Sequence, residues 1–138
     1  MKILYQATAT ASGGRDGTVK SSNGVLDLKL AIPKEMGGPG GAVPNPEMLF
    51  AAGYAACFDS ALQHVARQQK LKPGATQVQA TVGIGANEAS GFALAVTLEV
   101  TIPGLPRDEA QALLEAAHQV CPYSNAVRGN VPVELKLV

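Results

Sequence analysis

The two cysteines of the chain, Cys57 and Cys121, are the residues best suited to chemistry, and their surroundings differ. Cys57 lies within the apolar, small-residue segment 50–58, whereas Cys121 directly precedes Pro122. Two interpretations are open: a redox pair in which one thiol attacks and the other resolves, or two buried thiols that only fill space. Cys57 is the better candidate for the attacking thiol, because Cys121 is expected at a helix C-terminus, where the helix dipole disfavours a thiolate.

A thiolate at Cys57 needs a nearby cation, because the residue lies in the middle of a predicted helix, where the helix dipole has little effect. The candidate cations are Arg15, in a glycine-rich turn, and Arg128, which precedes Gly129. Gly53 lies one turn before Cys57, so the sulfur is expected to project over a residue without a side chain. That arrangement either leaves room for a substrate or allows close helix packing.

Other kinds of site receive little support from the sequence. His64 and His118 are far apart and form no ligand cluster with a cysteine, so no metal site is expected. The glycine-rich residues 37–41 match no phosphate-binding motif. No Ser-His-Asp arrangement can be argued.

The composition indicates a single globular domain, residues 1–138. The 11 basic and 11 acidic residues cancel and form no block of like charge, which argues against binding to nucleic acid or to an anionic membrane. Charged residues make up 16% of the chain, below the ordinary value of about 25%. A surface so poor in charge favours a homo-oligomer.

The N-terminal apolar run is too short for a signal peptide, and Gln6 and Thr8 interrupt it. No segment reaches the roughly 20 apolar residues of a membrane span. We therefore expect a cytoplasmic protein, in which thiols are kept reduced and a disulfide is transient.

The pattern of apolar residues predicts an α+β fold. Strands are predicted at residues 3–11, 18–21, 26–32, 78–84, 92–102 and 131–138, with tight turns at residues 13–17 and 22–24. A helix is predicted from Pro106 to about Val120, because Pro122 keeps the residue before it out of the helical conformation.

A longer helix is predicted from Asn45, as N-cap, to about Lys70, with Pro46 in its first position and Glu47 in its first turn. Residues 48–62 are apolar nearly all round, which predicts a buried core helix. At about 36 Å such a helix is as long as a domain of this size is wide. We therefore expect a partner subunit to help cover it.

Three motifs follow one another along nearly the whole chain: GGRDG at residues 13–17, NPEMLFAAGYAACF at 45–58 and CPYSNAVRGN at 121–130. Together they resemble the organic hydroperoxide resistance branch of the OsmC/Ohr family, and the first and third motifs favour that branch over the osmotically induced one. Two positions depart from the family pattern. Val43-Pro44 stands where Gly-Thr is common, and Val127 stands where Thr is common.

The resemblance implies an OsmC-like fold, with antiparallel sheets wrapped around a long buried central helix, in an intertwined homodimer with its sites at the subunit interface. It implies a thiol-dependent peroxidase that reduces organic hydroperoxides, including those of fatty acids, to alcohols. The implied reductant is a dihydrolipoyl group, as dihydrolipoamide or on a lipoylated protein, and no cofactor is bound.

Carried onto this chain, the resemblance makes Cys57 the peroxidatic cysteine and Cys121 the resolving one, with a Cys57–Cys121 disulfide between them. Arg15 and Glu47 are then expected to orient and activate the thiolate. Substrate contacts are expected at Met36, Phe50 and Phe58.

The spacing of Glu47 and Cys57 carries a further hypothesis. Ten residues of unbroken helix separate them by about 15 Å along its axis, so they cannot share a compact site within one protomer. We expect the Glu47–Arg15 pair that meets Cys57 to come from the other subunit.

Three alternatives remain at this point. The chain could be a non-catalytic module that binds apolar ligands and reports oxidation through its thiols, or a peroxidase tuned to hydrogen peroxide and served by thioredoxin. The apolar surroundings of Cys57 favour bulkier substrates than hydrogen peroxide. A structural protein with two inert thiols does not explain Arg15 and Glu47 in their motifs.

Overall fold

The computed structural model describes the whole chain, residues 1–138, which forms two compact units, Met1–Leu49 and Phe50–Val138. Each unit contains one three-stranded sheet. The mixture of helices and small sheets confirms the predicted α+β fold, while the single domain 1–138 stays a prediction. None of the helices combines the length and the apolarity that are needed to cross a membrane.

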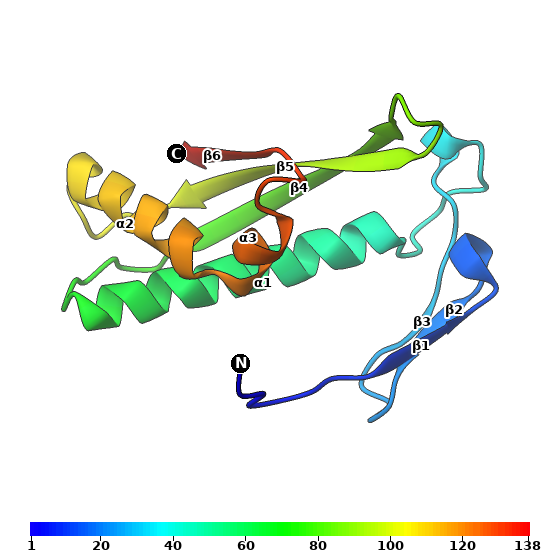
Figure 1. Cartoon of the computed structure of the whole chain (residues 1–138), viewed down its shortest axis with the longest axis horizontal. Helices are drawn as coiled ribbons and strands as arrows, with labels where there is room; N and C mark the ends of the chain where they lie inside the picture. Colours follow the sequence, from blue (N-terminus) through cyan, green and yellow to red (C-terminus); the bar gives the residue numbers. More distant parts are fainter. The chain divides into compact units, whose positions relative to one another are not determined.

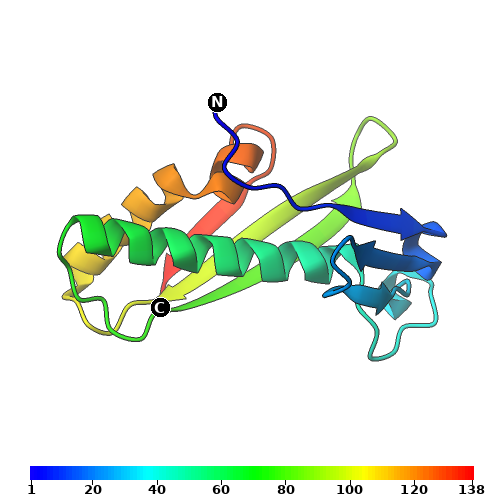
Figure 2. The same cartoon turned by 90° about the horizontal axis from the view of Figure 1, so that it is seen from below.

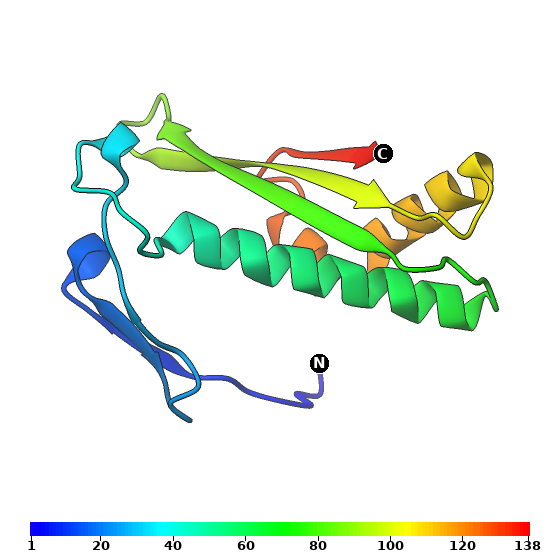
Figure 3. The same ribbon diagram turned by 180° about the vertical axis from the view of Figure 1, so that it is seen from behind.

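The first unit contains an antiparallel meander of three short strands, β1 (Ala9–Ser12), β2 (Thr18–Ser21) and β3 (Asp27–Lys29), seen in Figure 3. The single-turn helix η1 (Gly14–Asp16) joins β1 to β2, and a second one, η2 (Lys34–Met36), follows β3. Gly13 has a φ of 77°, and a side chain on Gly17 would collide with the backbone of the last residue of β1. The tight turn predicted at residues 13–17 is confirmed, and glycine is required at both of its ends.

Two predicted strands of this unit are shorter than expected. The strand predicted from residue 3 begins only at Ala9, and the strand predicted at residues 26–32 spans only Asp27–Lys29. Since β2 has four residues, it offers backbone partners to the last four residues of the first strand and to no more. Ile3, Leu4 and Tyr5 are each more than half exposed. The apolar pattern of these residues predicted a strand, but β2 is too short to pair with them.

The long helix α1 (Pro46–Gln68) begins where the sequence predicts. The side chain of Asn45 accepts a hydrogen bond from the Met48 amide at 2.9 Å, as an N-cap residue does. The helix ends just before the predicted Lys70, because Lys70 has a left-handed φ of 57°. The next amide bonds back to the carbonyl of Ala66 at 2.9 Å, which closes the helix in a Schellman motif.

The second unit has two layers, with helices covering one face of a sheet (Figure 1, Figure 2). The strands, in spatial order, are β4 (Gln77–Ala86), β5 (Phe92–Thr101) and β6 (Val133–Leu137). β4 and β5 form an antiparallel hairpin, as predicted. The helices α2 (Arg107–Val120) and α3 (Pro122–Val127) connect β5 to β6.

The prediction of purely antiparallel sheets is wrong for this unit, because β6 is parallel to β5. Parallel pairing requires a crossover connection, and α2 with α3 provides it. The sequence pattern predicts α2 but not α3, which has only six residues and no apolar periodicity of its own. Whether two strands pair in parallel or antiparallel depends on the segment that connects them, and the sequence of the strand alone does not reveal it.

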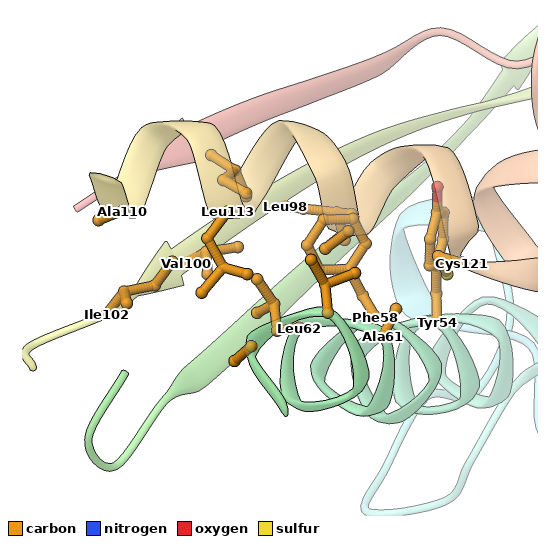
Figure 4. Close-up of a cluster of buried hydrophobic side chains, with 14 of the residues drawn as sticks. Tyr54, Phe58, Ala61, Leu62, Leu98, Val100, Ile102, Ala110, Leu113 and Cys121 are labelled. Carbon is orange, nitrogen blue, oxygen red and sulfur yellow. The ribbon is translucent and has the colours of Figure 1, made fainter. Parts of the chain in front are cut away.

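The core of the second unit lies between α1, α2 and the inner face of the sheet (Figure 4). Leu98 and Val100 of β5 are wholly buried and face Phe58 and Leu62 of α1, with Leu113 of α2 beside them. Complete burial of an aliphatic or aromatic side chain contributes about 1.5–3 kcal/mol. Buried and less buried side chains alternate along β5, as expected for a strand with one face in the core.

Within the single chain only one side of α1 is buried, and the expected covering of its other side by a partner subunit stays a prediction. Tyr54 and Phe58 point into the core and are 0% exposed. Ala52, Ala56 and Ser60 lie on the other side and are exposed. The helices and the sheet of this unit cover one face, and the opposite face consists of small residues between Ala52 and Ser60.

Val100→Ala is expected to lower the free energy of unfolding by about 2 kcal/mol, because two buried methyl groups are lost and a cavity remains. The control is Val25→Ala, the same change at a side chain that is 79% exposed in the turn between β2 and β3. That variant should stay within about 0.5 kcal/mol of wild type. Urea unfolding followed by circular dichroism measures both variants, and equal effects would contradict this assignment of the core.

Candidate active site

The two thiols lie next to each other in the second unit. The Cys121 thiol donates to the Cys57 sulfur, with 3.6 Å between the two sulfur atoms. Cys57 lies on α1 and is half-buried, whereas Cys121 follows the last residue of α2 and is 0% exposed. A disulfide has an S–S bond of about 2.05 Å, so a shift of roughly 1.5 Å would bring the sulfurs to bonding distance. Both cysteines are free thiols in the structure.

The immediate surroundings of Cys57 favour the protonated thiol. Burial raises the pKa of Cys57 above its ordinary value, and the neighbouring Cys121 raises it further. The backbone amide of Tyr123 donates a hydrogen bond to the Cys57 sulfur and partly offsets this rise. A reactive thiolate at this position therefore requires an additional positive charge, as the sequence led us to expect.

Cys57 also lines an open pocket of about 350 Å³ on the surface of the second unit. The other lining residues are mostly small or apolar: Ser60, Ala61, His64, Val120 and Pro122. Cys121 is absent from the lining and has no exposed surface. A small molecule that enters this pocket can therefore reach Cys57 but not Cys121.

Of the two uses expected for Gly53, the structure shows close packing. A Cβ atom on Gly53 would lie 3.0 Å from the hydroxyl oxygen of Tyr123 and 3.2 Å from its ring. The space above the glycine is thus filled by the Tyr123 side chain and is not left for a substrate. The missing side chain lets the start of α3 approach α1.

Arg15 and Glu47 form a bidentate ion pair within the first unit. Nη1 and Nη2 of Arg15 donate to the two carboxylate oxygens of Glu47, at 2.8 Å and 2.7 Å. The side chain of Glu47 is 13% exposed and that of Arg15 is 32% exposed. Glu47 owes its position to the first turn of α1, and Arg15 owes its position to the glycine turn around η1. Such two-point pairing fixes the plane of the guanidinium.

The remaining predicted site residues fall into different environments. Met36 is 37% exposed at the end of η2, and Phe50 contacts the rings of Tyr54 and Tyr123 at centroid distances of 6.0 Å and 6.1 Å. Phe58 is 0% exposed, so it offers no surface to a substrate in this chain. The substrate contacts of all three stay predictions.

Arg128, the second candidate cation, is engaged with other groups. It donates to Asn125 at 2.5 Å and to the backbone carbonyl of His118 at 2.7 Å. His118 and His64 belong to no group of three or more potential metal ligands, and the structure contains no such group. The Arg128 side chain is therefore bound near the C-terminal end of α2.

Several residues near the thiols escape prediction from the sequence. The Tyr123 amide contacts the Cys57 sulfur, and Ser124 bonds to both Tyr54 and His118. The motif CPYS contains Tyr123 and Ser124 and could have drawn attention to them. Their partner Tyr54 lies in the motif at residues 45–58 and could have been found in the same way, whereas their partner His118 lies in none of the three motifs.

Comparison with known proteins shows the family to which this chain belongs. Residues 38–136 match the sequence model of the family described as OsmC-like protein. The organic hydroperoxide resistance protein of Xanthomonas axonopodis pv. citri is 54% identical over 99% of this chain and 96% of its own length. OhrB of Bacillus subtilis, also called an organic hydroperoxide resistance protein, is 47% identical over 97% of this chain and 98% of its own.

A solved structure agrees with these sequence matches. The crystal structure of an organic hydroperoxide resistance protein from Elizabethkingia anophelis, described with a bound thiocyanate, superposes with a TM-score of 0.96. The two proteins are 58% identical, and the match covers 99% of this chain and 98% of that one. The chain therefore belongs to the OsmC/Ohr family, in its organic hydroperoxide resistance branch.

The Arg15–Glu47 pair predicts a dependence of stability on pH. The hydrogen bonds from Arg15 lower the pKa of Glu47 below its ordinary value, so the stabilisation is present above the ordinary pKa of glutamate, about 4.3, and is lost as the pH falls through the lowered one. Glu47→Gln should therefore be less stable than wild type near pH 6.5, and the difference should shrink toward pH 3. Urea unfolding at several pH values measures it.

The control for this measurement is Asp27→Asn, which removes the exposed Lys20–Asp27 pair at 2.8 Å. Both side chains of that pair are more than half exposed, so its effect should be small at every pH. A Glu47→Gln difference that stays constant from pH 6.5 to pH 3 would show that the pair adds no charge-dependent stability.

Proposed function

We propose that this protein is a thiol-dependent peroxidase that reduces organic hydroperoxides to alcohols. The observation that carries the proposal is the 3.6 Å approach of a buried thiol, Cys121, to a thiol that lines an open pocket, Cys57. One sulfur is reachable by a substrate, and the other is held where it can react only with the first. The names of the relatives, organic hydroperoxide resistance proteins, agree with this chemistry.

The proposed reaction has three steps. The Cys57 thiolate attacks the terminal peroxide oxygen, the O–O bond breaks, and the alkoxide takes up a proton and leaves as an alcohol. Cys57 is then a sulfenic acid. Cys121 attacks this sulfur, water leaves, and a Cys57–Cys121 disulfide forms. Two exchanges with an external dithiol restore both thiols and leave the dithiol oxidised.

We assign the activation of Cys57 to Arg15, with Glu47 as the group that orients the guanidinium. Burial raises the pKa of Cys57, so a cation beside the sulfur would favour the thiolate. The bidentate pair at 2.7–2.8 Å keeps Arg15 charged and directed.

The protein is proposed to act as a homodimer, with the Arg15–Glu47 pair of one subunit completing the thiol site of the other. The ten-residue separation of Glu47 and Cys57 along the unbroken helix α1 supports this arrangement. So does the exposed small-residue face of α1 at Ala52 and Ala56, which suits a close partner.

The substrates are proposed to be organic hydroperoxides, including those of fatty acids, because the pocket beside Cys57 is mostly apolar. We propose a dihydrolipoyl group, free or on a lipoylated protein, as the reductant. No bound cofactor is required, because the electrons come from the thiols. The reaction fits the cytoplasm, where thiols are kept reduced.

The wild-type protein should consume tert-butyl hydroperoxide and linoleic acid hydroperoxide with dihydrolipoamide as reductant, and hydrogen peroxide more slowly. Cys57→Ser should abolish consumption, because no nucleophile remains. Cys121→Ser should react once and then stall, because the sulfenic acid has no resolving partner. Assays of the remaining peroxide at fixed times measure consumption. Mass spectrometry of the peptide that contains Cys57 shows its oxidation state.

Two other outcomes of this assay would replace the proposal. An absence of turnover in wild type as well as in Cys57→Ser would indicate a module that only binds apolar ligands. Faster turnover with hydrogen peroxide and thioredoxin than with the organic substrates and dihydrolipoamide would indicate the other kind of thiol peroxidase.

The shared site is tested with mixed dimers of Cys57→Ser and Glu47→Ala chains. If the pair acts across the subunits, one of the two sites in a mixed dimer keeps both native groups. The mixed dimer should then be more active than either parent homodimer. Activity no higher than that of the better parent would place both groups in the same chain.

A further inference from the structure

A buried serine hydroxyl that the proposed reaction does not use lies three residues after Cys121 in the chain. Ser124 is 0% exposed, and its Oγ lies 2.9 Å from the hydroxyl of Tyr54 and 2.9 Å from Nδ1 of His118. Tyr54 belongs to α1, His118 to α2 and Ser124 to α3. A single oxygen atom therefore connects all three helices.

The hydrogen bonds of this chain can run in one direction. With His118 neutral, its Nδ1 accepts from the Ser124 hydroxyl, which in turn accepts from the Tyr54 hydroxyl. Burial raises the pKa of Tyr54, and burial together with the charge of Arg128 lowers the pKa of His118. Both groups are therefore neutral near pH 7. Loss of the serine hydroxyl would leave the buried Tyr54 hydroxyl and the half-buried Nδ1 of His118 without their partner.

Ser124 also adjoins the two groups that contact the Cys57 sulfur. Tyr123, the preceding residue, donates its amide to that sulfur. Cys121, three residues earlier, holds its own sulfur 3.6 Å away. The far end of the short helix α3 is tied to α2 as well, because Arg128 donates to the carbonyl of His118 at 2.7 Å. The hydroxyl thus lies at the centre of the segment that carries the resolving thiol.

We propose that Ser124 and His118 are positioning residues for the disulfide between the two cysteines. With Tyr54 they form a hydrogen-bonded chain, buried at Tyr54 and Ser124 and half-buried at His118, that holds the turn between α2 and α3, so that the resolving thiol faces the attacking one. This inference rests on the proposed function and deepens it. Disulfide formation depends on how closely the two thiols are held, so a looser turn lowers their effective concentration.

The competing role for His118 is simple packing, since its ring lies 6.3 Å from that of Phe58 in the core. Two substitutions separate the roles. His118→Asn keeps a polar atom close to the place of Nδ1 and loses volume, whereas His118→Leu keeps volume and loses the polar atom. A positioning chain tolerates Asn better than Leu, and a packing role gives the reverse order.

The experiment measures the disulfide equilibrium of the full-length protein in mixtures of reduced and oxidised glutathione. Protein dithiol and glutathione disulfide give protein disulfide and two glutathione thiols, so the reaction is balanced without a peroxide. Acid quenching, alkylation and mass spectrometry give the fraction of Cys57–Cys121 disulfide. Ser124→Ala should lower the effective concentration of the thiol pair about two- to tenfold, the factor for one hydrogen bond.

The matched control is Thr76→Val. The Thr76 hydroxyl also bridges two side chains, since it donates to Asp59 at 2.5 Å and accepts from Gln63 at 2.6 Å. That bridge is half-buried and includes neither cysteine nor α3. The variant should leave the thiol equilibrium at its wild-type value, and circular dichroism confirms that each variant is folded.

An unchanged thiol equilibrium in folded Ser124→Ala would overturn the proposal, and so would a His118→Asn variant no closer to wild type than His118→Leu. If Ser124→Ala does not fold, the His118 pair decides alone. Failure of the peroxidase proposal looks different: wild type would form the disulfide with glutathione yet consume no hydroperoxide. The two proposals therefore fail separately.

Discussion

The approach of Cys121 to Cys57 is the contact on which the rest of the thiol site depends, and a proline sets it. Pro122 keeps Cys121 in an extended conformation, with φ of −61° and ψ of 122°, so α2 ends there and α3 starts in a new direction. The Cys121 side chain thereby enters the core, 3.6 Å from the Cys57 sulfur. A helix that continued through this position would bring neither the Cys121 thiol nor the Tyr123 amide to α1.

Burial of the two thiols limits which molecules can reach them and also disfavours the thiolate of Cys57. A wholly buried Cys121 is protected from outside reagents, but the same apolar surroundings raise the pKa of Cys57. In the proposed reaction, a thiolate at Cys57 must then be favoured by a charge from elsewhere. We propose that Arg15 supplies that charge. Glu47 binds the Arg15 guanidinium at two points, and the N-cap at Asn45 fixes the turn of α1 from which Glu47 projects.

Local signals in the sequence predicted several parts of this arrangement. The start of α1 at Asn45, the end of α2 before Pro122 and the turn around Arg15 all follow from residues close in the chain. The signals failed where the answer depended on distant partners. The first strand is short because β2 is short, and β6 is parallel because a crossover precedes it. Apolar alternation reports an exposed or buried face, not the strand that will pair with it.

The sequence by itself determined the local structure around the candidate residues, because caps, proline breaks and glycine turns act over a few residues, and the three motifs lie within such segments. Only the tertiary structure decided that the two thiols meet, that Tyr123 fills the space above Gly53, and that Ser124 joins Tyr54 to His118. These contacts connect residues separated by up to 70 positions. They depend on how α1, α2 and α3 pack in three dimensions, and no local preference encodes that packing.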